Sequence, residues 1–299
     1  MTSETDAGVR EIWLEVDGLR VRCLTAGAGG PPTLLLHGGG FDSADFSYGP
    51  IVGPLSRGRR VFAPDWPGYG GSDGPDLDYD LAYYVDFLEC LMDTLRLTRA
   101  ALIGLSMGGG AALGFALRFP DRVERLVLVD SYGLGREIPR GRLGYFLART
   151  PLAADLIYAL MRRSRRILRW GLLSVVHDRR VVTDGLIEQA RGLLDEPGSG
   201  RAFRSFRHNE VLWDGLRTDF SDRLAEITAP TLIIHGAHDP AVPVAWARRA
   251  HERLPNSELR VFDACGHWPP RERPEEFNRV VNDFLSRQAL GRGCQVHHE

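Results

Sequence analysis

The sequence predicts an α/β protein with a doubly wound, mostly parallel sheet and a helical cap inserted after one of its strands. Short, near-continuously apolar runs alternate along the chain with segments whose apolar residues recur every three or four positions. Such runs are typical of strands buried on both faces, and their alternation with helices indicates right-handed βαβ units. One long stretch, residues 133–222, has helical patterning without any buried-strand run.

The first strands are expected to form an antiparallel hairpin. Glu11–Val16 and Leu19–Thr25 flank Asp17-Gly18, a dipeptide that favours a tight hairpin turn. Further strands follow it in the predicted sheet. They are expected at Thr33–Leu36, Arg60–Ala63, Ala100–Ile103, Leu126–Val129, Thr231–Ile234 and Glu258–Phe262.

Helices are expected between these strands. In Tyr79–Leu95 the apolar residues are spaced three and four apart, which draws one face of an α-helix. Met107–Phe119 is rich in Gly and Ala and ends before Pro120. Two later helices are predicted at Val244–Arg253 and Pro274–Arg287.

These elements predict one core domain, residues 11–132 and 223–287, interrupted by a helical cap at 133–222 and flanked by loose tails at 1–10 and 288–299. Ligands of an open parallel sheet bind beyond the C-terminal ends of its strands, so an insertion there would cover the site. The Arg-rich run at 162–170 is most simply the solvated face of a cap helix. A substrate contact by one of its arginines is the alternative.

The composition excludes several classes of protein. The chain has 299 residues, of which 43% are hydrophobic and 25% charged, an ordinary globular balance. A formal net charge of -2 offers no basic excess for nucleic acid or an anionic membrane. All 37 cationic residues are Arg, so no lysine Schiff base can form and pyridoxal-phosphate chemistry is excluded.

Cysteine spacing and the N-terminus predict a cytoplasmic protein. The four cysteines, Cys23, Cys90, Cys265 and Cys294, are far apart and form no CxxC pair. This pattern favours reduced thiols over a disulfide framework or a zinc site. The first residues are polar and acidic, unlike a signal peptide. No apolar run reaches the roughly 18–20 residues of a membrane span.

The strongest chemical signal is Gly104-Leu105-Ser106-Met107-Gly108, which follows an apolar strand and precedes a Gly/Ala-rich helix. A sharp strand-to-helix turn would hold Ser106 in a strained conformation and lift its hydroxyl above the sheet edge. The helix N-terminus behind it would supply partial positive charge where an oxyanion forms. Ser106 is therefore the candidate nucleophile, and a bystander serine in a Gly-rich turn is the alternative.

An oxyanion hole needs a second donor, and His37-Gly38-Gly39-Gly40 supplies it at the end of a buried strand. Glycines leave backbone N–H groups free to point at a ligand. We expect the N–H of Gly39 to pair with that of Met107 in this hole. The alternative is that the glycines form only a flexible loop. His37, in the same loop, is expected to be structural rather than the base.

The candidate base is His267, in a loop after a predicted strand and before the last helix. A histidine can take a proton from serine and return it near neutral pH. The candidate acid is Asp239, which follows another strand and precedes His267, giving the chain order Ser, Asp, His. Asp130, at the end of the strand before the cap, is the alternative acid. Asp65 is expected to organise a turn.

With these residues in place, the chain resembles the α/β-hydrolase superfamily over residues 11–287. The resemblance rests on HGGG, APDWPGYGGSD, GLSMGG, HGAHDPAVP and CGHWPPRERPEEFN, in that order. SMGG, CGHW and the following PEEFNRVVNDFL are most similar to the meta-cleavage product hydrolases, which cut a carbon–carbon bond in vinylogous diketo acids. Trp268, beside the base, is part of that resemblance.

The chain departs from that branch at three points. Gly40-Phe41-Asp42 replaces its GPG motif, and Leu105 stands where Asn is common. The Arg that holds the substrate carboxylate in that branch aligns with Ala190, and Arg191 follows it. One residue along a helix turns a side chain by about 100°. The resemblance implies Gly38, Gly40, Trp268 and Arg191 as substrate-binding candidates.

Three functions follow as hypotheses. The first is a serine hydrolase acting on a small ester, lactone or related acyl compound. The second is a carbon–carbon hydrolase of dienol keto acids. The third is a non-hydrolytic, small-molecule-binding protein of the same fold, because fold alone never settles function. No metal or organic cofactor is expected for a Ser-His-Asp mechanism. A homodimer formed through the cap or an edge strand is an open possibility.

Overall fold

A single eight-stranded sheet organises the chain in the computed structural model, which describes residues 8–138 and 141–287. The strand order is β1-β2-β4-β3-β5-β6-β9-β10; β1 and β2 pair antiparallel, β2 pairs antiparallel with β4, and every pairing from β4 to β10 is parallel. The strands are β1 (Arg10–Val16), β2 (Leu19–Ala26), β3 (Pro32–Leu36), β4 (Arg60–Pro64), β5 (Ala100–Leu105), β6 (Val123–Val129), β9 (Thr231–Gly236) and β10 (Ser257–Phe262).

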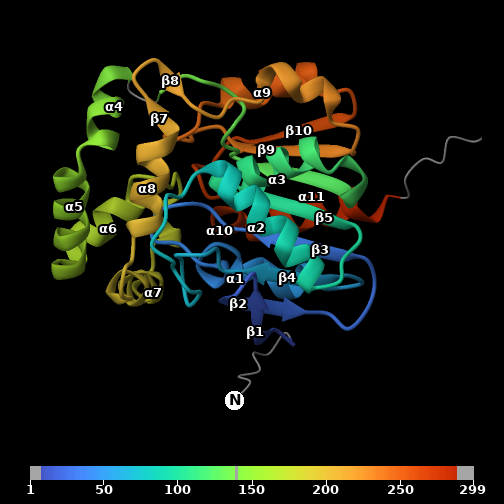
Figure 1. Ribbon diagram of the computed structural model, residues 1–299, viewed down its shortest axis with the longest axis horizontal. Coiled ribbons are helices and arrows are strands. Elements are labelled where there is room, and N and C mark those ends of the chain that lie inside the picture. Colours follow the sequence, from blue (N-terminus) through green and yellow to red (C-terminus); the bar gives the residue numbers. More distant parts are fainter. Residues whose placement is uncertain (1–7, 139–140, 288–299) are drawn as a thin grey trace, which may run out of the picture.

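Helices cover both faces of this sheet (Figure 1). Side chains along β5 alternate between two hydrophobic clusters, because successive residues of a strand point to opposite faces. One cluster contains residues of α2, α3 and α9, and the other contains residues of α1 and α11. These helices, with the short α10, are α1 (Ala44–Leu55), α2 (Leu81–Thr94), α3 (Met107–Arg118), α9 (Val244–Arg253), α10 (Pro269–Glu272) and α11 (Pro274–Ser286).

A helical insertion separates β6 from β9. Its helices lie together at one end of the sheet, on the left in Figure 1. They are α4 (Gly141–Arg149), α5 (Pro151–Arg163), α6 (Arg165–Leu173), α7 (Asp184–Asp195) and α8 (Arg201–Glu210). The doubly wound, mostly parallel sheet with a helical cap that the sequence predicts is thus confirmed.

The structure also contains elements that the sequence did not predict. Helix α1 carries Pro50 and Pro54 and buries residues on most of its circumference, so its sequence lacks a helical stripe. A small hairpin, β7 (Val211–Leu212) and β8 (Gly215–Leu216), follows α8. Each of its strands has two residues, too few to show an alternating pattern. Short 3₁₀ turns lie at Pro120–Arg122, Arg179–Val181 and Ser221–Glu226.

Other expectations can be compared with the structure in part. Asp65 accepts hydrogen bonds from the N–H groups of Ala44 (2.7 Å) and Gly71 (3.0 Å), which confirms its turn-organising role. Cys23, Cys90 and Cys265 are free thiols, while Cys294 and the tail at 288–299 lie outside the described residues. None of the helices in the described ranges combines the length and hydropathy needed to cross a membrane.

One buried carboxylate ties the cap to the core. Glu210, at the end of α8, is 1% exposed. Its Oε1 accepts from the N–H that opens α2, at Leu81 (3.1 Å). Its Oε2 accepts from the Tyr132 hydroxyl (2.8 Å) and the Thr218 N–H (3.1 Å). Because three donors from separate segments converge on it, this side chain fixes where α8 sits over the sheet.

We expect Glu210→Ala to destabilise the protein by about 2–4 kcal/mol, because it leaves buried donors without an acceptor. The measurement is the urea midpoint of unfolding. The control is Glu252→Ala on the exposed face of α9, where a change within about 0.5 kcal/mol is expected. Equal midpoints for Glu210→Ala and wild type would contradict this role.

Candidate active site

Ser106 occupies the turn between β5 and α3, with φ 51° and ψ -115°. Neither Gly104 nor Gly108, which lie two residues before and after it, has room for a Cβ. A Cβ at Gly104 would lie 2.3 Å from the Gly108 carbonyl oxygen, and a Cβ at Gly108 would lie 2.1 Å from that of Leu36. The glycines of the motif are therefore a steric requirement of the turn, and Ser106 is held in a strained conformation of the kind found at functional sites.

The glycine loop after β3 runs beside Ser106. A Cβ at Gly38 would lie 3.5 Å from the Ser106 Cβ. The Gly38 N–H donates to Asp42 Oδ2 (3.0 Å), so it is engaged within the loop. The next residue, Gly39, is overlaid by a cap side chain, because a Cβ there would lie 2.5 Å from the Phe203 ring of α8. The loop thus commits the Gly38 N–H to Asp42, which favours Gly39 for the donor role predicted for it.

Asp42 is an organiser of this loop that the sequence analysis missed. Besides the Gly38 N–H, its carboxylate accepts from the Ser43 N–H (2.8 Å) and the Ser47 hydroxyl (2.8 Å). Trp268 Nε1 in turn donates to Ser47 Oγ (3.3 Å). His37 is structural, as expected, since its Nε2 accepts from the Trp66 N–H (3.0 Å). No pattern in the sequence predicts these contacts, because they join segments that come together only in the folded protein.

His267 and Asp239 form a hydrogen-bonded pair. His267 Nδ1 lies 2.7 Å from Asp239 Oδ2. The other oxygen, Oδ1, accepts from the N–H groups of Ala241 (2.7 Å) and Val242 (3.0 Å). Burial alone would raise the pKa of Asp239, but the adjoining His267 ring and these hydrogen bonds outweigh it and hold the pKa below its usual range. Asp239 therefore presents an ionised carboxylate that is hydrogen-bonded to the His267 ring.

The loop that carries His267 is fastened from two directions. The His267 N–H donates to the Val175 carbonyl of the cap (2.8 Å). Glu272 of α10 accepts from the Gly266 N–H through Oε1 (2.9 Å) and from the His177 N–H through Oε2 (2.7 Å). Glu272 is 5% exposed. The cap thus helps to set the position of the candidate base.

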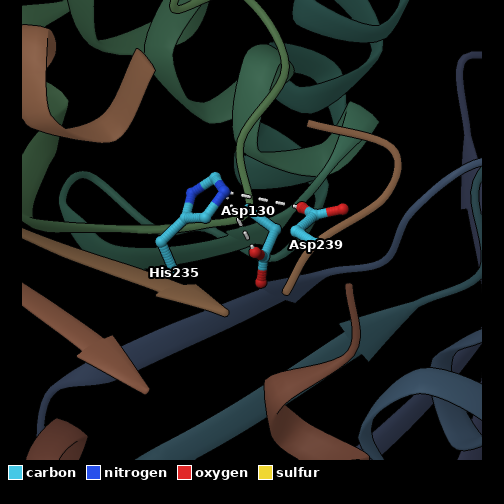
Figure 2. Close-up of side chains that lie close together, drawn as sticks. All are labelled: Asp130, His235 and Asp239. Carbon is cyan, nitrogen blue, oxygen red and sulfur yellow. Dashed lines mark ion pairs between the residues drawn. The ribbon is translucent and has the colours of Figure 1, made fainter. Parts of the chain in front are cut away.

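Asp130, the alternative acid, lies at the end of β6 and is fully buried. It is Asp239 that hydrogen-bonds His267, while Asp130 accepts from the Gly236 N–H (2.9 Å). Asp130 Oδ1 and Asp239 Oδ2 each lie 3.5 Å from His235 Nε2, so the three side chains converge (Figure 2). Such a trio can resemble a metal site. Here His235 Nε2 faces the Val242 carbonyl oxygen (3.0 Å) and Asp239 Oδ2 serves His267, so both atoms already have protein partners.

Ser106 and His267 line the same cavity, of about 420 Å³. The predicted contacts Gly38, Gly39, Gly40 and Trp268 also line it. No arginine belongs to its described lining, in which apolar side chains predominate. The apolar side chains are Phe41, Phe46, Leu105, Met161, Trp170, Leu172, Val175, Phe203, Ala241 and Trp268.

A second cavity, of about 360 Å³, shares Ser106, Phe203 and Ala241 with the first. Its lining includes Arg207 of α8 and the predicted oxyanion residue Met107. Burial lowers the pKa of Arg207. The guanidinium nevertheless stays charged near neutral pH, because arginine deprotonates only at very high pH. Ser106 therefore adjoins two cavities, and the second is lined by the Arg207 cation and by Glu210, whose carboxylate is hydrogen-bonded to Leu81, Tyr132 and Thr218.

Arg191 does not belong to the described lining of either cavity. It lies on α7 with its side chain 43% exposed and 3.7 Å from Glu188, while its neighbour Ala190 is fully buried. The Arg-rich run is engaged elsewhere as well, since Arg165 pairs with Asp184 (3.0 Å). The structure thus gives no support to Arg191 as a substrate contact, and it presents Arg207, which the sequence analysis did not single out.

Comparison with known proteins gives a consistent family. Residues 32–274 match the family model of the alpha/beta hydrolase fold. The 2-hydroxy-6-oxo-2,4-heptadienoate hydrolase of a Pseudomonas putida strain is 34% identical over 273 residues, covering 90% of this chain and 94% of the relative. A 2-hydroxymuconate semialdehyde hydrolase from Pseudomonas putida is 35% identical, covering 86% of this chain and 88% of the relative.

A solved structure agrees with these relatives. The meta-cleavage product hydrolase from Pseudomonas fluorescens IP01, solved as a mutant complexed with acetates, superposes with a TM-score of 0.78 at 30% identity. The match covers 92% of this chain and 97% of that one. The chain therefore belongs to the alpha/beta hydrolase fold family and is a hydrolase similar to the meta-cleavage product hydrolases.

Proposed function

We propose that this protein is a serine hydrolase in which Ser106 is the nucleophile, His267 the general base and Asp239 the acid that orients the base. The observation that carries the proposal is the 2.7 Å contact between His267 and Asp239 at a cavity that Ser106 also lines. Nucleophile, base and orienting group around one cavity are the parts that acyl transfer requires.

The chemistry follows from these roles. His267 Nε2 takes the Ser106 proton as Oγ attacks the substrate carbonyl, and the imidazolium is stabilised by the Asp239 anion. The backbone N–H groups of Gly39 and Met107 hold the oxyanion, aided by the N-terminus of α3. His267 then gives its proton to the leaving group, and water releases the acyl-enzyme by the same steps.

The dimensions and lining of the main cavity favour a small, largely apolar acyl compound, such as an ester or lactone. Its volume of about 420 Å³ lies within the range typical of small-molecule sites. The apolar rings of Phe46, Phe203 and Trp268 would hold the acyl part by burial. The expected cytoplasmic location and the possible homodimer stay predictions.

The names of the relatives favour a second candidate, hydrolysis of a carbon–carbon bond in a dienol keto acid. Such a substrate carries a carboxylate, which needs a cation in the site. Because the described lining of the main cavity holds no arginine and Arg207 lines the adjoining one, we propose Arg207 as the carboxylate partner in that case. The substrate would then span both cavities, with its carbonyl at Ser106.

We expect Ser106→Ala to reduce hydrolysis of a short p-nitrophenyl ester by at least about 10⁴-fold, because the nucleophile is removed. Wild type should also be labelled by a fluorophosphonate, and the variant should not. Ser131→Ala, a nearby buried hydroxyl outside both cavity linings, is the control and should retain activity and labelling. Unlabelled wild type with no turnover would favour a non-hydrolytic binding protein.

For a dienol keto acid, we expect Arg207→Met to raise KM about tenfold to a hundredfold, because a charge-assisted hydrogen bond to the carboxylate is lost. Loss of the yellow dienolate absorbance measures the reaction. Turnover of a neutral ester should change less than about threefold, because that substrate has no carboxylate for Arg207 to bind. Arg191→Met is the matched control on the cap surface. An unchanged KM in Arg207→Met would remove this residue from substrate binding.

A further inference from the structure

We propose that Asp130 is a positioning residue of this site, which stays protonated and donates a hydrogen bond to the Asp239 carboxylate. It would act through Asp239 and touch neither the substrate nor His267. The inference rests on the proposed function, because it gives a role to a group behind the predicted acid. It concerns a fully buried carboxyl to which the serine mechanism assigns no task.

The geometry puts Asp130 against Asp239. One side-chain oxygen of Asp130, one of Asp239 and one ring nitrogen of His235 lie within 4.8 Å of one another (Figure 2). Asp130 Oδ1 accepts from the Gly236 N–H (2.9 Å), whereas the buried Oδ2 receives no hydrogen bond from the described residues. An ionised carboxylate would leave that oxygen unpaired in the interior, which is costly. A protonated one uses it as a donor instead.

The surroundings hold too little positive charge for two buried anions. Around Asp130 stand Asp239, His235, Glu272 and Cys265, with His267 beyond Asp239. His235 is neutral, because burial lowers its pKa and its Nδ1 has no partner within the described part of the chain. Asp239 has the imidazole of His267 and two backbone N–H donors, whereas Asp130 has one N–H. When two carboxyls share a buried site, the less supported one keeps its proton.

The titration directions agree with this assignment. Burial first, and the adjacent Asp239 anion second, raise the pKa of Asp130 well above its usual range. Burial would raise the pKa of Asp239, but the adjoining His267 ring and its hydrogen bond, followed by a hydrogen bond from Asp130, lower it. The proton thus resides on Asp130, and the negative charge resides on Asp239 beside His267.

The backbone at Asp130 supports a positional role. Its φ is 43°, a left-handed conformation that costs free energy for a residue other than glycine. The Asp130 N–H is held by the Ile234 carbonyl of the neighbouring strand (3.0 Å). This strained, anchored backbone directs the carboxyl across the end of β9, where Asp239 follows. With that donor, Asp239 gains a further partner besides His267 and the two backbone N–H groups, and it is less free to rotate away from His267.

The test compares Asp130→Asn with Asp130→Leu. Asparagine keeps an acceptor for the Gly236 N–H and an N–H donor for Asp239, whereas leucine fills similar space and has neither. We expect kcat of Asp130→Asn to stay within about threefold of wild type and kcat of Asp130→Leu to fall about tenfold to a hundredfold, with KM nearly unchanged. The substrate is the p-nitrophenyl ester.

The pH profile of kcat/KM is the readout that a purely structural role would not move. In Asp130→Leu, Asp239 loses a donor, holds the imidazolium of His267 more strongly and shifts the acidic limb to higher pH. In Asp130→Asn the limb should stay in place. An infrared band of a protonated carboxyl, present in wild type at neutral pH and lost in Asp130→Asn, measures the proton directly. Asp65→Asn, a buried carboxyl in the turn after β4 that is hydrogen-bonded to none of Asp130, Asp239 and His267, should leave the limb unmoved.

Three results would overturn the proposal. A limb shifted to lower pH in Asp130→Asn would mean that an anion had been removed, hence an ionised Asp130. An unshifted limb in Asp130→Leu would reduce the residue to packing. Activity that survives Asp239→Asn but not Asp130→Asn would make Asp130 itself the acid. All three presuppose that Ser106→Ala is inactive, so a failure of the proposed function is recognised separately.

Discussion

The close approach of α3 to the backbone of β3 and β5 is the constraint on which the rest of the site depends. With glycine at 104 and 108, the chain can reverse within the few residues that present Ser106. Any side chain there would collide with a carbonyl oxygen and push the helix off the sheet edge. The glycine loop after β3, the cavity and the loop that carries His267 are all arranged around the Ser106 hydroxyl.

Residues of both the core and the cap hold the site residues in position. The core supplies the strand ends that carry Ser106, Asp130 and Asp239, whose rigid parallel pairing fixes their spacing. The cap supplies the Val175 carbonyl that receives the His267 N–H and the Phe203 ring above Gly39. Val175 and Phe203 also line the cavity, so the cap segments that bound it are the ones that hold the His267 loop and cover Gly39.

Much of this could be predicted from local pattern. Apolar runs gave the strands their places within a few residues, and the glycine-flanked Ser106 stood out because a strained turn restricts composition so strongly. Asp42 and Glu272 could not be predicted, because their partners are backbone N–H groups brought near by folding. The placement of Arg191 could not be predicted for a related reason: packing decides which face of a helix is buried, and α7 places this side chain at the surface beside Glu188.

The hydrogen bond from His267 to the Val175 carbonyl has a consequence for how this architecture can diversify. A cap grafted from a relative onto this core would need a carbonyl that accepts the His267 N–H and an aromatic ring over Gly39. Without them, replacing the whole segment between β6 and β9 would displace the His267 ring. Changes in ligand preference are thus expected to arise through single substitutions within the cap, rather than through replacement of the whole cap.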